Sequence, residues 1–70
     1  DHINILVNGN DEQVRLVIRN MTGSIYLSEI KNINQQRLIS LSVDDFSTGI
    51  YFIEISGRTV KQFSKILKNE

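Results

Sequence analysis

Residues 44–55 read DDFSTGIYFIEI, and this stretch decides the fold. A polar turn leads into Gly49, and a dense run of β-branched and aromatic residues follows it. Such a run is typical of a strand in the middle of a sheet. A period of two places Tyr51 and Ile53 on one face and Phe52 on the other. We therefore expect a central strand over residues 50–55, entered through a sharp turn in which Gly49 takes a positive φ.

The spacing of residues around Gly49 predicts a tyrosine corner. In Greek-key sandwiches, a tyrosine near the start of such a strand often donates a hydrogen bond to the backbone of the preceding corner. Phe46, Gly49 and Tyr51 have a suitable spacing, and Phe46 is placed to drop under the same core. On this interpretation, the Tyr51 hydroxyl reaches the backbone of residues 44–47, and both Gly49 and Tyr51 have architectural roles.

Five further segments have the composition of strands and are separated by turn residues. They are residues 3–7, 13–19, 24–30, 38–43 and 59–67. Gly23 is expected to supply the left-handed position of a bulged hairpin turn, and a bulge near residues 62–64 would reconcile the mixed parity of the last strand. Parity also places Ile25 and Leu27 on one face. The pattern predicts an all-β fold, a small antiparallel immunoglobulin-like β-sandwich of six to seven strands.

The length of 70 residues is enough for one domain, so we expect a single domain over residues 1–70. A chain of this size buries only about 60% of its unfolded surface, and it has no cysteine to form a disulfide. Stability must therefore come from a well-packed core formed by the residues that alternation turns inward. We expect this core to consist of Ile5, Leu16, Ile18, Leu27, Leu41, Phe46, Tyr51 and Ile53.

The sequence lacks the residue patterns of a catalytic, metal-binding or cofactor-binding site. Its single histidine, His2, is expected at a frayed N-terminal end, where it offers no base to a nucleophile, and a zinc site needs three or four ligands. The pair Asp44 and Asp45 offers too few oxygens for calcium, and the glycines form no phosphate-binding pattern. Eight basic and eight acidic residues are interspersed, which argues against a nucleic-acid partner. We expect a protein that is not an enzyme and needs no cofactor.

Three motifs, taken in order, resemble the C-terminal sorting domain of type IX secretion system substrates (the Por secretion system of Bacteroidota). They are NMTG at residues 20–23, STGIYF at 47–52 and KILK at 65–68. That family shows a turn glycine after its second strand, a Leu-x-x-Gly-x-Tyr block and terminal lysines, and Phe46 stands here in place of the leucine. The chain has no proline, so the Pro-Asn-Pro-like run that usually precedes the first strand is missing, which suggests truncation or cleavage.

The resemblance implies a non-catalytic secretion signal at the C-terminal end of a larger protein. The implied partners are the type IX outer-membrane translocon and its shuttle proteins, a sortase-like C-terminal signal peptidase, and a covalently linked upstream cargo domain. The implied localisation is the periplasm in transit and then the cell surface or the medium. The residues that match the family pattern, and so are candidates for translocon recognition, are Gly23, Gly49, Tyr51, Lys65 and Lys68.

Physical considerations leave two further questions open. The last strand is accessible and could add to the sheet of a partner. The face that carries Ile50 and Phe52 is either an open apolar patch or is partly covered by long side chains such as Arg15 and Arg19.

The alternative function is that of an immunoglobulin-like carbohydrate-binding or adhesive module, or of a structural spacer in a multidomain secreted enzyme. An adhesive module would favour a row of exposed aromatic residues, and the chain has no tryptophan.

Overall fold

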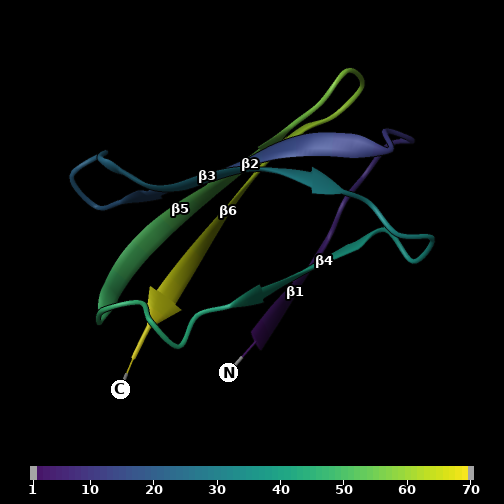
Figure 1. The fold of residues 1–70 in the computed structure, drawn as a ribbon. Helices are drawn as coiled ribbons and strands as arrows, with labels where there is room; N and C mark the ends of the chain where they lie inside the picture. The colour runs from purple at the N-terminus through teal and green to yellow at the C-terminus, as the bar shows by residue number, and fades with distance from the viewer. Residues whose placement is uncertain (1, 70) are drawn as a thin grey trace.

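The computed structural model of the chain describes residues 2–69, and within this range it is all-β with no helix. Six strands follow one another along the chain (Figure 1). They are β1 (His2–Leu6), β2 (Gln13–Asn20), β3 (Ile25–Asn32), β4 (Leu38–Ser42), β5 (Gly49–Ser56) and β6 (Lys61–Lys68). The expected all-β fold is confirmed, because every pairing is antiparallel and the strands form two sheets.

The two sheets form the layers of a small sandwich. One sheet has four strands in the order β3-β2-β5-β6, and the other pairs β1 with β4. Figure 1 shows the two-stranded layer lying across from the larger sheet. The chain passes between layers from β1 to β2, from β3 to β4 and from β4 to β5. Strand β5 lies between β2 and β6, so the expectation that the segment after Gly49 forms an interior strand is confirmed.

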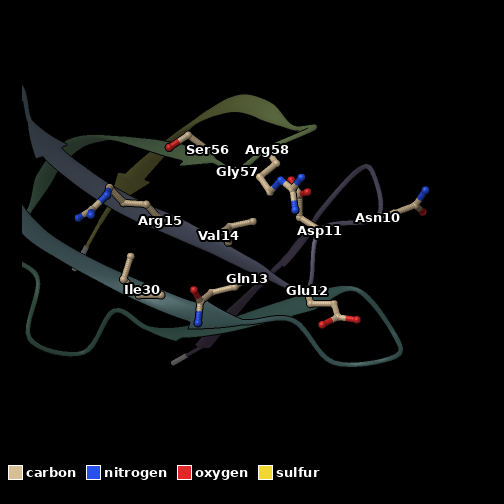
Figure 2. Close-up of a pocket in the computed structure, with 10 residues that line it drawn as sticks. All are labelled: Asn10, Asp11, Glu12, Gln13, Val14, Arg15, Ile30, Ser56, Gly57 and Arg58. Atoms are coloured by element: carbon tan, nitrogen blue, oxygen red, sulfur yellow. The ribbon is translucent and has the colours of Figure 1, made fainter.

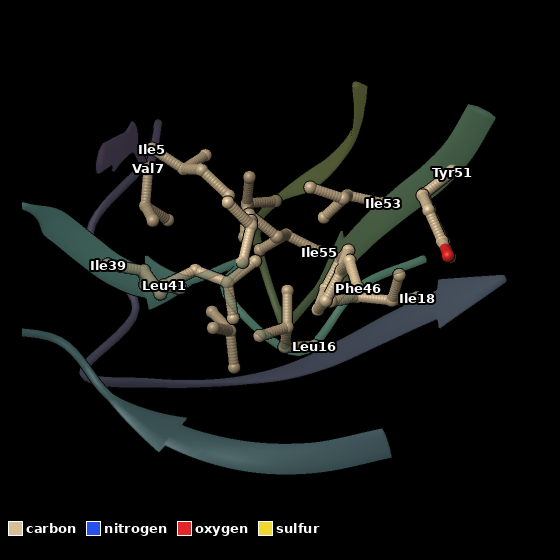
Figure 3. Packing of buried hydrophobic residues seen from close by; sticks show 13 residues of the cluster. Ile5, Val7, Leu16, Ile18, Ile39, Leu41, Phe46, Tyr51, Ile53 and Ile55 are labelled. Carbon is tan, nitrogen blue, oxygen red and sulfur yellow. The ribbon is translucent and has the colours of Figure 1, made fainter. Parts of the chain in front are cut away.

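The core fills the space between the layers (Figure 3), and alternation along each strand explains its membership. Strands β4 and β5 both turn every second side chain inward. The buried cluster consists of Ile5, Val7, Val14, Leu16, Ile18, Ile39, Leu41, Val43, Phe46, Tyr51, Ile53, Ile55 and Val60. Seven of the eight expected core residues belong to it, and Leu27 packs against it while remaining partly exposed.

A bulge exists in the larger sheet, but at a different place from the one expected. The register between β5 and β6 is unbroken, so the predicted bulge near residues 62–64 is wrong. Alternate side chains of β6 instead point to opposite faces of the sheet, so Phe63 and Leu67 lie exposed on the face away from the core. The register shifts between β2 and β3, where Ile18 pairs with Leu27 and the next residue of β2 pairs with Ile25. The prediction that Ile25 and Leu27 share a face is therefore also wrong.

Side chains of β6 tie the two layers together along one side of the sandwich. Gln62 donates from Nε2 to the Leu6 carbonyl at 2.9 Å and accepts from the Asn8 amide at 2.9 Å through Oε1. Lys68 donates from Nζ to the Val43 carbonyl at 2.9 Å. Because these contacts lie near opposite ends of β6, they hold the strand over β1 at one end and over the end of β4 at the other.

Candidate functional site

The structure brings all five motif residues into the same half of the four-stranded sheet, from its end to its middle. Across β5 and β6, Gly49 pairs with Lys68, and Lys65 pairs with the residue after Tyr51. Across β2 and β5, Tyr51 pairs with the last residue of β2, and the turn that contains Gly23 follows directly. Residues that are up to 45 positions apart in the sequence therefore lie close together. We call this region, defined by Gly23, Gly49, Tyr51, Lys65 and Lys68, the motif end.

Gly23 takes part in a hairpin turn that a neighbouring asparagine organises. Gly23 has a φ of 90°, as expected for the left-handed position of the turn, and its N–H donates to the Asn20 carbonyl at 3.0 Å. The Asn20 side chain accepts from the amide and hydroxyl of Thr22 and from the amide of Ser24 through its Oδ1. A side chain at Gly23 would meet no atom within 4 Å, so the turn needs its backbone conformation and leaves open space beside it.

The tyrosine corner is confirmed. The Tyr51 hydroxyl donates to the Ser47 carbonyl at 2.9 Å, within the segment expected for this contact. The Tyr51 ring is buried and packs against Phe46 at a centroid distance of 4.7 Å and against Tyr26 at 5.5 Å. Gly49, at φ 152°, makes the entry into β5 that turns the next side chains to the correct faces. Both residues therefore act on the fold, and the Tyr51 side chain offers a partner little accessible surface.

The two lysines of the motif end differ in their surroundings. Lys68 lies on the inner parity of β6, where its ammonium group donates to the Val43 carbonyl. Lys65 lies on the outer parity and is exposed, and its backbone pairs with that of Phe52. Among residues 2–69, Lys65 has no ion pair. Lys65 is therefore the motif residue that presents a charged group to solvent.

An apolar groove runs over the outer face of the sheet beside Lys65. Its volume is about 270 Å³, and its walls come from the β2–β3 turn and from the middle of β5 and β6. The lining residues are Arg19, Asn20, Met21, Gly23, Phe52, Ile53, Glu54, Phe63 and Ser64. Met21 and Phe63 are both 68% exposed, and because they border the same groove they form a contiguous apolar patch of the kind that marks interaction sites. Of the two alternatives left open for the face around Phe52, the structure combines both, because Phe52 is exposed and Arg19 forms part of the groove wall.

A second, wider hollow of about 750 Å³ lies at the opposite end of the sheet, and Figure 2 shows the residues around it. Its most buried polar residue is Asp11, whose Oδ2 accepts from the Thr59 amide at 2.9 Å. This hydrogen bond from the Thr59 backbone is the main reason that the pKa of Asp11 lies below its ordinary value, and Arg37 contributes a smaller electrostatic effect. Because this carboxylate already accepts hydrogen bonds from the chain, it serves to hold the β5–β6 turn.

Arg37 closes the same end of the sandwich. Its φ is 61°, in the left-handed region that few residues other than glycine adopt. Its guanidinium group donates to the carbonyls of Val7, Asn8 and Asp11, and its backbone carbonyl accepts from the Val7 amide at 2.8 Å. The β1–β2 loop is therefore wrapped around one side chain. The partners of Arg37 lie 26 to 30 positions away, so local sequence patterns gave no sign of this role.

The described residues provide neither a metal centre nor a membrane-spanning helix. Within residues 2–69, no group of three or more histidine, cysteine, aspartate or glutamate side chains is placed to hold a metal ion. The same part of the chain contains no helix of the length and hydropathy needed to cross a membrane. The surface features that stand out in this range are thus the motif end with its groove and the hollow around Asp11.

Comparison with known families identifies the class of protein. A family model described as the secretion system C-terminal sorting domain matches residues 1–69. The chain belongs to this family and is a C-terminal sorting signal of the type IX secretion system, so it interacts with the type IX machinery. Substrates of this system are carried to the cell surface or released. No curated protein and no solved structure matches the chain.

Proposed function

We propose that residues 1–70 form the sorting domain at the C-terminal end of a larger secreted protein and are recognised, during passage through the periplasm, by the outer-membrane translocon and its shuttle proteins. The family match over residues 1–69 carries this proposal. The placement of the motif residues in the same half of one sheet supports it, because the residues that maintain the fold lie close to the exposed Lys65.

The five motif residues divide into two groups on the proposed assignment. Gly23, Gly49, Tyr51 and Lys68 maintain the fold, because the two glycines have positive φ and the other two residues donate hydrogen bonds to the backbone. Lys65 belongs to the recognition surface, since it is exposed beside the apolar groove and forms no ion pair within residues 2–69. In protein interfaces, apolar and aromatic side chains form the centre and polar groups form the solvent-accessible rim, so we place Lys65 at the rim of such a surface.

The domain itself is proposed to be non-catalytic, and a sortase-like signal peptidase is proposed to separate it from the upstream cargo at the cell surface. Membership in a family of sorting signals supports the first statement. The engagement of Asp11 in hydrogen bonds to the β5–β6 turn is also in keeping with it. The second statement is tested by mass spectrometry of an exported fusion, which should show cargo that has lost the domain.

The function is tested with a reporter that carries a signal peptide and has this domain fused to its C-terminal end. In a bacterium with a working type IX system, the fusion should reach the surface or the medium, while the reporter alone should stay in the periplasm. Lys65→Ala should reduce export and leave the melting temperature of the domain within error, because an exposed surface change usually costs less than about 0.5 kcal/mol.

Arg58→Ala is the matched control for this experiment. Arg58 is exposed in the turn at the opposite end of the β5–β6 hairpin, so its replacement removes one positive charge far from the motif end. Export of this variant should equal that of the wild type. Equal export of the Lys65→Ala variant would remove Lys65 from the recognition surface, and retention of the unmodified fusion in the periplasm would contradict the proposed function itself.

A further inference from the structure

Strand β6 is an edge of the four-stranded sheet, and its free backbone groups can be identified. The Gly57 amide donates to the Val60 carbonyl at 2.9 Å, so these two residues form a hydrogen-bonded pair at the start of the β5–β6 ladder. Hydrogen-bonded and non-hydrogen-bonded pairs alternate along an antiparallel ladder, and this register is unbroken. The residues whose N–H and C=O groups point away from β5 are therefore Lys61, Phe63, Lys65 and Leu67.

The side chains of these same four residues all lie on the outer face. They are exposed and alternate between lysine and a large apolar residue along the strand. Any strand that paired with this edge would therefore lie beside a row with two ammonium groups and two apolar side chains. Phe63 also forms part of the wall of the apolar groove, so the edge and the groove form one continuous surface.

The charge of this edge has one sign. Every charged residue of β6 is a lysine. The nearest carboxylate on the outer face is that of Glu54, and it is engaged by Arg19 at 3.0 Å and, more distantly, by Lys61 at 4.0 Å. A partner strand with acidic side chains would thus find positive charge that the described part of the chain leaves uncompensated, as at Lys65.

The same charge pattern disfavours pairing between two copies of this chain. A second β6 at this edge would bring together two strands whose charged residues are all lysines, and neighbouring like charges are unfavourable. The opposite edge of the sheet is less suitable for either partner. Strand β3 carries the register shift near Ile25, and its charges compensate each other, because Lys31 pairs with Glu29 at 3.0 Å.

We propose that β6 is a docking edge for an extended, acidic segment of a partner protein, which adds to the sheet as a fifth strand. Its backbone pairs with the four outward-pointing residues of β6, its carboxylates meet Lys61 and Lys65, and an apolar side chain contacts Phe63 or Leu67. Main-chain hydrogen bonds supply affinity and the alternating side chains supply selectivity, as in other cases of strand addition. This inference rests on the proposed function, since it specifies the kind of partner segment that binds beside the motif end.

The test uses the isotope-labelled domain and two strand-length synthetic peptides with the repeats Glu-Thr-Val-Thr and Lys-Thr-Val-Thr, so that one face of each peptide alternates between a charged residue and valine. Titration with the glutamate peptide should shift and protect the amides of Lys61, Phe63, Lys65 and Leu67. The intervening amides of β6 already donate to β5 and should change little. The lysine peptide should bind at least about tenfold more weakly.

Two variants make the outcome specific. Lys61→Glu combined with Lys65→Glu should reverse the preference, so that the lysine peptide binds and the glutamate peptide does not. Phe63→Pro removes one outward N–H without removing a bond to β5 and should weaken binding, because proline is tolerated at sheet edges. If that variant fails to fold, the charge-reversed variant decides the question.

Several results would overturn the proposal: no response of β6 to the glutamate peptide, equal binding of both peptides, or protection on β3 instead. Binding to phosphatidylglycerol vesicles without any response to the peptide would assign the lysines to a lipid surface and would equally overturn it. Each of these results leaves the sorting function standing if the unmodified fusion is still exported. Failure of that fusion to leave the periplasm would count against the sorting function, whatever the peptides do.

Discussion

Removal of the Tyr51 hydroxyl should lower the stability of the domain by about 1 kcal/mol. Tyr51→Phe deletes the donor to the Ser47 carbonyl and keeps the ring that packs against Phe46. A hydrogen bond of this kind contributes roughly 0.5–1.5 kcal/mol net. Ser47 is exposed, so water can reach its carbonyl in the variant and limits the loss. For a domain of this size, 1 kcal/mol corresponds to a fall in melting temperature of about 4–8 °C.

The measurement is urea unfolding followed by far-ultraviolet circular dichroism, with thermal melts in parallel. The midpoint should fall while the slope of free energy against urea stays constant, because the variant buries the same surface. Tyr26→Phe is the matched control, since it removes the same atom from the second tyrosine of the chain. The Tyr26 hydroxyl donates to the Asp45 carbonyl at a longer distance, 3.1 Å, from the edge strand β3, so its loss should cost less.

A Tyr51→Phe midpoint equal to that of the wild type would show that the hydrogen bond to the Ser47 carbonyl adds no stability. The prediction would also be wrong if Tyr26→Phe were the more destabilising of the two changes, because the corner would then contribute no more than an exposed hydroxyl. A changed slope in either variant would point to altered compactness and would require amide exchange at Ser47 and Tyr51 to locate the effect.

The other predictions concern the loops at the far end and the link between layers. Gly57→Ala should lower the melting temperature, because a Cβ there would clash with the Asp11 carboxylate, which would have to move away from the Thr59 amide. Asp11 has a lowered pKa, so its charged form stabilises the fold above pH 3.8, and this contribution disappears as the pH falls through the folded-state pKa. The Asp11→Asn variant should therefore be less stable than the wild type at neutral pH. The urea midpoints of the two proteins should converge in acid. Gln62→Ala should lower the urea midpoint and expose the amide of Asn8 to faster hydrogen exchange, because the bonds to Asn8 and to the Leu6 carbonyl are lost together.

The sequence predicts the strands and most of the core because both depend on local alternation. Leu16 and Ile18, and likewise Tyr51 and Ile53, recur with period two, and the structure buries all four. The tyrosine corner was also predictable, since its donor and acceptor are four residues apart. These features need no knowledge of which strand pairs with which.

The features that the sequence did not predict depend on pairing. The mixed parity of β6 suggested a bulge, because Phe63 and Leu67 were assumed to face the core. In the structure they face outward and the ladder is regular. The register shift between β2 and β3 lies beside Tyr26, whose ring centroid is 4.8 Å from that of Phe46. This contact joins β3 to the connection between β4 and β5, so no single segment of the sequence indicates it.

The candidate site was predicted as a set of residues but not as a surface. Spacing and resemblance selected Gly23, Gly49, Tyr51, Lys65 and Lys68, and the structure brings them into the same half of the sheet. The different surroundings of Lys65 and Lys68 follow from the strand register, because alternate side chains of β6 point to opposite faces of the sheet. Asp11 and Arg37 were missed altogether, because their contacts join loops that are distant in the sequence.

Because buried motif residues maintain the fold and Lys65 is exposed on it, recognition of the signal by its partner should depend on the folded state of the domain. On the proposed assignment, Lys65 and the free edge of β6 take their positions only when β6 is paired with β5 and anchored through Gln62 and Lys68. An unfolded chain carries the same residues but not the same row of lysines and apolar side chains on one face. Recognition would therefore depend on the folded domain, and a change at Tyr51 could reduce export through stability alone. Export and unfolding must for this reason be measured on the same variants, since only a loss of export at unchanged stability locates a contact with the partner.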